Sequence, residues 1–156
     1  MQLTRNQIHR LSIQKTPDSV FQALVQPSAI QAWWGAHSAI VLGRKNGVWS
    51  ALWGENPDDP EYLTTARILI WEPPFHLALD QLQYYAKSGP LGFEASFRID
   101  YRLWTERDDT VLQINHDGFP ITASADGFFK GCQQGWADSL TQLKKYLESL
   151  ENEPIG

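Results

Sequence analysis

The chain has 156 residues and a formal net charge of −5, a size that predicts one domain over residues 1–156. The negative charge speaks against a nucleic-acid-binding protein, which needs a basic surface. No segment approaches the roughly 20 apolar residues of a membrane span, and residues 1–12 lack the apolar run of a signal peptide. The single cysteine, Cys132, excludes an internal disulfide and suits a reducing compartment. We therefore expect a cytoplasmic protein without stable membrane insertion.

The first elements predicted are a strand and two short helices. Residues 7–14 alternate between apolar and polar side chains, which is typical of a strand with one buried face. Thr16 suits the N-cap of a following helix, and Pro17 suits its first position. Pro27 ends that helix, and residues 28–34 predict a second one.

The middle of the chain predicts an antiparallel sheet. The expected strands cover residues 38–42, 48–53, 62–71, 75–82, 93–104 and 110–117, with a loop over 84–90. The segment 93–104 alternates most regularly. Its register predicts that Phe97 and Tyr101 point towards the last helix, whereas Arg98 and Arg102 face solvent.

A long C-terminal helix is expected to begin between Thr122 and Asp126. Its apolar stripe consists of Cys132, Trp136, Leu140, Leu143 and Leu147. Gly127, Gly131 and Gly135 recur every four residues, although each costs about 1 kcal/mol relative to Ala inside a helix. Three explanations stay open: close contact between helix and sheet, space left for a pocket, or a helix that begins only after Gly131.

In this order, the elements predict an α+β helix-grip fold. In such a fold a curved antiparallel sheet wraps around a long C-terminal helix, two short helices follow the first strand, and a cavity lies between helix and sheet. The chain also has seven Trp and seven Phe, an excess that indicates a large core, a wide apolar pocket or both.

Several short motifs support this interpretation. They are Pro17-x-x-Val20-Phe21, Pro27 followed by Trp33-Trp34, Glu72-Pro73-Pro74, His116-x-Gly118-Phe119, and Gly135-Trp136 with Leu140, Leu143, Tyr146 and Leu147. With these motifs the chain resembles the START-like, or SRPBCC, superfamily with the birch-pollen-allergen fold. It looks closest to the family of homologues of the activator of heat shock protein ninety ATPase. Gln26 departs from the Asp or Asn usual in relatives, which predicts a weakly capped second helix.

The resemblance implies a cavity between the sheet and the N-terminal half of the last helix. The ligand-binding residues expected there are Trp34, Trp53, Phe97, Tyr101, Leu112, Ile114, His116, Phe129, Cys132 and Trp136. Trp34 and Trp136 are the best aromatic candidates, and Tyr101 and His116 are the polar ones. His116 has an alternative role as a hydrogen-bonded core residue, and Cys132 suits an inert buried thiol better than a nucleophile.

Fold does not fix function in this superfamily, which holds ligand carriers, cyclases, hydroxylase domains and stress proteins. The first hypothesis is that the cavity binds a small hydrophobic or amphipathic molecule. The second is a chaperone-interaction module without a ligand. It is weakened because only a few residues precede the first strand, whereas eukaryotic chaperone activators carry a further domain there. The third is a cyclase-like enzyme. The four His residues are scattered singly, so neither a metal nor another cofactor is expected.

Overall fold

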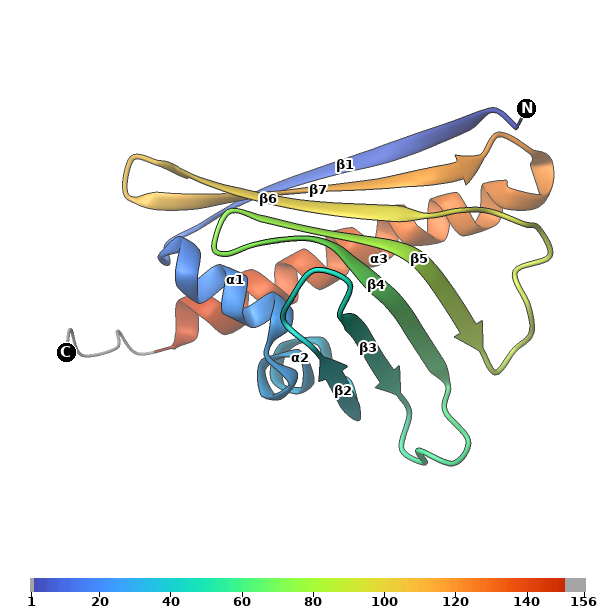
Figure 1. The fold of residues 1–156 in the computed structure, drawn as a ribbon, viewed down its shortest axis with the longest axis horizontal. Helices are drawn as coiled ribbons and strands as arrows, with labels where there is room; N and C mark the ends of the chain where they lie inside the picture. The colour runs from blue at the N-terminus through green and yellow to red at the C-terminus, as the bar shows by residue number, and fades with distance from the viewer. Residues whose placement is uncertain (1, 151–156) are drawn as a thin grey trace.

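The computed structural model describes residues 2–150, which form seven strands and three helices. In chain order the elements are β1 (Thr4–Ile13), α1 (Pro17–Val25), α2 (Pro27–Trp34), β2 (Ser38–Val41), β3 (Val48–Trp53), β4 (Tyr62–Glu72), β5 (His76–Ala86), β6 (Arg98–Glu106), β7 (Asp109–Pro120) and α3 (Ala123–Ser149). The strands make one antiparallel sheet in the order β1-β7-β6-β5-β4-β3-β2. The sheet curves around α3, and α1 and α2 lie beside the C-terminal half of that helix (Figure 1). The α+β helix-grip prediction is confirmed.

The two short helices are separated by a single residue. The Thr16 hydroxyl accepts a hydrogen bond from the Ser19 N–H at 3.2 Å and so caps α1. Gln26 ends α1, because its N–H still donates to the Gln22 carbonyl, and Pro27 then begins α2. The Gln26 side chain forms no capping bond, so the expected weak cap is confirmed.

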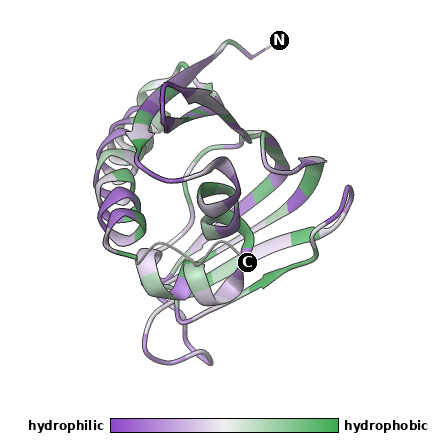
Figure 2. Ribbon diagram, turned by 90° about the vertical axis from the view of Figure 1, so that its left-hand side faces the viewer, coloured by the Kyte–Doolittle hydropathy of each residue, from purple (hydrophilic) through white to green (hydrophobic). Residues whose placement is uncertain are grey.

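Hydrophobic and hydrophilic residues alternate along the strands (Figure 2), and the apolar side chains of the core lie on the sheet face that covers α3. Phe97, Ile99 and Tyr101 are buried on this face, whereas the Arg98 side chain is 43% exposed on the other. The predicted register is therefore confirmed. Strand β6, however, begins only at Arg98 instead of residue 93, because residues before it have no hydrogen-bonded partner on β7.

Strand β5 extends further than expected, to Ala86 instead of Leu82. Gln81 adopts a positive φ of 52°. At this residue the alternation shifts by one position, so that Leu79 before it and Leu82 after it both face inwards. Tyr84 therefore belongs to a strand and points towards the helix, although the sequence predicted a loop there.

Helix α3 begins at Ala123, so the predicted start between Thr122 and Asp126 is confirmed. All three glycines lie in the helix interior, which rules out the alternative of a helix that begins only after Gly131. From Trp136 onwards the helix is packed on the core through Trp136, Leu140, Leu143 and Leu147. Between Gly127 and Gly135, by contrast, no residue is buried. This half of α3 is held at the β1 edge of the sheet, where Gln7 Nε2 donates to the Phe129 carbonyl at 2.6 Å. The site described next lies on the side of the helix that carries the glycines.

Candidate functional site

A cavity of about 510 Å³ lies between the first half of α3 and the sheet. Its wall comes from α2, from five strands and from α3. The lining residues are Trp34, Trp49, Trp53, Tyr62, Thr64, Leu79, Leu82, Tyr84, Ile99, Tyr101, His116, Gly127, Phe128, Gly131, Cys132, Gly135, Trp136 and Ser139. Both the size and the apolar, aromatic lining are those of small-molecule sites. Tyr62 is 58% exposed, so the cavity opens to solvent beside β4.

The three glycines of α3 form one wall of this cavity. A Cβ atom added at Gly127, Gly131 or Gly135 would meet no atom within 4 Å. The glycines therefore do not serve a close approach of helix and sheet. Each one instead leaves open space where any other residue would place a side chain.

Tryptophans make the wall at the α2 end rigid. The Trp34 ring stacks on Trp33 with centroids 4.5 Å apart and meets the edge of Trp53 at 5.7 Å. Its indole N–H donates to Ser139 Oγ at 3.0 Å, and the Trp53 N–H donates to the Trp34 carbonyl at 3.0 Å. These bonds fix flat apolar rings around the cavity and satisfy their polar atoms within the wall.

A short chain of hydrogen bonds supplies the polar part of the wall. Trp136 Nε1 donates to His116 Nδ1 at 3.0 Å, and His116 Nε2 lies 3.1 Å from the Tyr84 hydroxyl. Burial, helped by the nearby His9, lowers the pKa of His116 to about 3, so this imidazole is neutral at physiological pH. Burial also raises the pKa values of Tyr84 and Tyr101, and it raises that of the Cys132 thiol to about 12.

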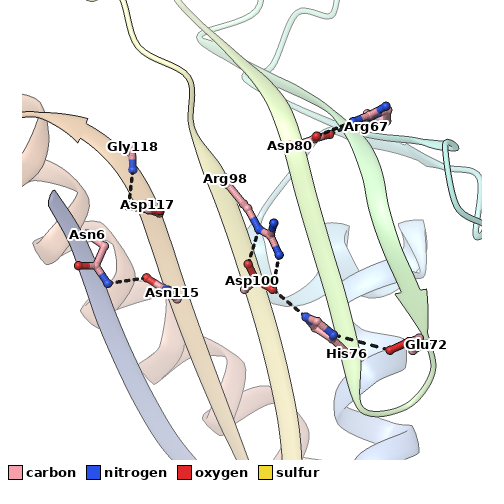
Figure 3. Close-up of polar contacts among 10 residues, drawn as sticks. All are labelled: Asn6, Arg67, Glu72, His76, Asp80, Arg98, Asp100, Asn115, Asp117 and Gly118. Atoms are coloured by element: carbon pink, nitrogen blue, oxygen red, sulfur yellow. Dashed lines mark hydrogen bonds and ion pairs between the residues drawn. The ribbon is translucent and has the colours of Figure 1, made fainter. Parts of the chain in front are cut away.

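No Asp, Glu, Lys or Arg from residues 2–150 lines the cavity. Charged side chains gather instead on the face of the sheet turned away from α3, where Figure 3 shows ion pairs across β4, β5 and β6. Arg98 Nε donates to Asp100 at 2.6 Å, and His76 Nε2 lies 2.7 Å from the same carboxylate. Burial would raise the pKa of Asp100, but these hydrogen bonds outweigh it and hold that pKa below its usual value. The two faces of the sheet thus differ in charge, and only the concave face, which carries the cavity, suits an uncharged ligand.

Comparison with known families decides the classification. The profile of the family described as activator of Hsp90 ATPase homolog 1-like protein matches residues 14–148. The chain belongs to this family. Since the match runs from before α1 almost to the end of α3, it includes every element that lines the cavity. A comparison with functionally curated proteins found no sequence match.

Solved structures agree with the family in fold. The chain is similar to CalU16 from Micromonospora echinospora, with 20% identity, a TM-score of 0.67, and 94% of this chain and 78% of that chain covered. The Aha1 dimer from Colwellia psychrerythraea shares 20% identity with a TM-score of 0.72, over 95% of this chain and 99% of the other. Protein MLL2253 from Mesorhizobium loti shares 17% identity with a TM-score of 0.76, over 95% and 100% of the two chains. At these identities the likeness establishes the SRPBCC-type fold alone.

The structure places the residues expected to bind a ligand in two groups. Those that line the cavity are Trp34, Trp53, Tyr101, His116, Cys132 and Trp136. Those that do not line it are Phe97, Leu112, Ile114 and Phe129.

The second group has other partners in this family member. Leu112 and Ile114 are at most 1% exposed and are covered by the core. Phe97 packs in an aromatic cluster, with Phe119 at 5.1 Å. The Phe129 ring lies under the Arg5 guanidinium at 3.7 Å, on the side of α3 that faces β1. The sequence pattern therefore predicts which residues face inwards. It does not predict which of these are covered by the core and which line the cavity.

Tyr84 is a functional candidate that sequence reasoning missed. It lines the cavity and contacts His116, but the sequence placed it in a loop. The alternation of Leu82, Tyr84 and Ala86 was the available signal, and the change of facing at Gln81 obscured it.

Residues 2–150 contain no group of three or more His, Cys, Asp or Glu side chains placed to hold a metal ion. None of the helices in this part of the chain has the length and apolar character needed to cross a membrane.

Proposed function

We propose that this protein binds a small, uncharged and largely apolar molecule in the cavity between α3 and the sheet. The observation that carries the proposal is the row of three helix glycines facing about 510 Å³ of open space. Three glycines in one helix cost about 3 kcal/mol of helix propensity relative to alanine. A ligand that occupies the space beside these glycines would explain why three of them occur in one helix.

The chemistry of the wall favours binding over cyclase-like catalysis. General acid–base catalysis works best with groups whose pKa lies near the working pH. Burial moves the pKa of His116 down to about 3 and that of Cys132 up to about 12, both far from neutrality. The wall thus offers stacking surfaces, chiefly Trp34, Trp53 and Trp136, and neutral polar anchors at Tyr101 and His116. We propose these residues as the ligand contacts, and the cytoplasm as the place where the protein works.

A titration with the uncharged dye N-phenyl-1-naphthylamine, whose fluorescence rises in apolar surroundings, tests the proposal. The parent protein should bind the dye at one saturable site. Gly131→Leu places a side chain in the cavity and should weaken dye binding at least about tenfold, which corresponds to roughly 1.4 kcal/mol. Ala137→Leu is the matched control, because Ala137 lies exposed on the same helix outside the cavity. Equal binding by the parent and Gly131→Leu would contradict the proposal.

A second candidate function is docking on a chaperone ATPase, which the description of the family suggests. The observation that favours it is an apolar patch at one end of the sheet. Strand β2 is the last strand in the sheet order. Ile40 within β2 is 62% exposed, and Leu42 directly after it is 48% exposed. If docking is the function, the protein should stimulate the ATPase of an Hsp90-type chaperone. Ile40→Asp should then abolish the stimulation, whereas Gly131→Leu should not.

A further inference from the structure

The cavity contains a hydrogen-bond arrangement whose direction is fixed by chemistry. An indole N–H donates and has no capacity to accept. Trp136 Nε1 lies 3.0 Å from His116 Nδ1, so this ring nitrogen accepts and carries no proton. Burial keeps His116 neutral at physiological pH. Its one proton must therefore reside on Nε2.

The next bond in the chain follows from this assignment. His116 Nε2 carries the proton and lies 3.1 Å from the Tyr84 hydroxyl oxygen, so the imidazole donates and Tyr84 accepts. The hydroxyl proton of Tyr84 then has to point elsewhere. Within residues 2–150 no acceptor for it is found, and Tyr84 lines the cavity. Tyr101, also in the wall, likewise forms no hydrogen bond in this part of the chain.

A ligand that fills the cavity shields the Tyr84 O–H from water, and a donor buried without an acceptor is costly. A ligand that itself brings an acceptor avoids that cost. A carboxylate is a poor candidate, because no cationic side chain of residues 2–150 lines the cavity to neutralise it. A primary or secondary amide needs more from the wall, because its N–H would require a further acceptor such as the Tyr101 or Thr64 hydroxyl oxygen. A carbonyl group without an N–H, as in a ketone, a quinone or an ester, fits the donors and adds no unmatched group.

We infer that the ligand of this cavity carries such a carbonyl on an apolar skeleton, and that the Tyr84 O–H donates to it. Trp136 and His116 are positioning residues, since the indole fixes the imidazole tautomer and the imidazole turns the phenol proton into the cavity. This inference rests on the proposed binding function and specifies the chemical class of the ligand.

The tautomer can be tested without any ligand. Long-range ¹H–¹⁵N NMR spectra at neutral pH should show His116 with its proton on Nε2 and an unprotonated Nδ1. Trp136→Phe removes the indole donor, so His116 should then populate the Nδ1–H form as well. A parent spectrum with the proton on Nδ1, or with both nitrogens protonated, would overturn the inference whatever the cavity binds.

The ligand class is tested with two probes of nearly equal shape, 9-fluorenone and fluorene, which differ by the carbonyl. Competition against N-phenyl-1-naphthylamine gives both affinities. The parent should prefer fluorenone about fivefold, the usual order for one neutral hydrogen bond. Tyr84→Phe should bring the two affinities within about twofold of each other while fluorene binding stays as in the parent. Tyr85→Phe is the matched control, because the adjacent Tyr85 is exposed outside the cavity and its loss should leave the preference unchanged.

The outcomes separate the two proposals. Equal binding of both probes to the parent overturns the carbonyl inference and leaves the binding function standing. A preference that survives Tyr84→Phe, or that is lost in Tyr101→Phe instead, overturns the role of Tyr84. If the parent binds neither probe nor the dye, the proposed function itself fails and the inference fails with it.

Discussion

Replacing the three helix glycines together with alanine is the sharpest test of the cavity geometry. Each replacement should gain about 1 kcal/mol of helix propensity. An added Cβ at Gly127, Gly131 or Gly135 meets nothing within 4 Å, so no overpacking offsets that gain. The triple variant should therefore unfold with a free energy about 2–3 kcal/mol higher than the parent. For a chain of this length this corresponds to a rise in Tm of roughly 5–10 °C.

Urea denaturation, followed by circular dichroism and by tryptophan fluorescence, measures the effect. The same variant should bind N-phenyl-1-naphthylamine more weakly, because the added methyl groups occupy part of the cavity. Stability and binding thus move in opposite directions. A triple variant that is less stable than the parent by about 1 kcal/mol or more would show that α3 packs closely on the sheet there, and the reasoning would be refuted.

Two further predictions concern stability. Because the pKa of His116 is about 3 in the folded protein and about 6.5 in an unfolded chain, its contribution is fully present above about pH 6.5 and is lost as pH falls towards 3. Between pH of about 7.5 and about 5, the parent should therefore lose about 2 kcal/mol more than His116→Asn does; equal losses in pH-dependent urea melts would show that His116 is not held neutral. Gly118→Ala should destabilise the protein by at least about 2 kcal/mol, since Gly118 has a φ of 103° and its new Cβ would collide with the Ser96 carbonyl. A melt of Gly118→Ala that resembles that of Gly131→Ala would contradict this reading of the two sites.

The helix-grip fold was predictable because its signals are local. Thr16 and Pro17 define the start of α1 by capping chemistry alone. The alternation from Phe97 to Leu103 reports which face of β6 is buried, without knowledge of any partner strand. The boundaries were less predictable where pairing decides them: β6 begins at Arg98, its first residue paired with β7, although β7 itself continues to Pro120.

The cavity was predictable in location and only partly in composition. Periodicity assigns Leu112, Ile114 and His116 to the same inward face of β7, but of these residues only His116 lines the cavity. The difference depends on which part of α3 packs on the core, and the run of buried residues that does so begins at Trp136. Tyr84 escaped prediction because the positive φ of Gln81 changes the facing of β5 in its middle. Neither cause can be read from a period of two residues.

The binding site itself can be located with the indole N–H groups. The seven Trp residues give separate ¹H–¹⁵N signals, and they divide into those that line the cavity and those that do not. Trp34, Trp49, Trp53 and Trp136 line it, whereas Trp104 lies on the outer face of the sheet next to Arg10. Titration with N-phenyl-1-naphthylamine should shift the signals of the lining residues, above all Trp34, Trp53 and Trp136, and leave that of Trp104 in place. Saturation of the dye with the lining signals unmoved, or with the largest shift at Trp104, would contradict binding in the cavity.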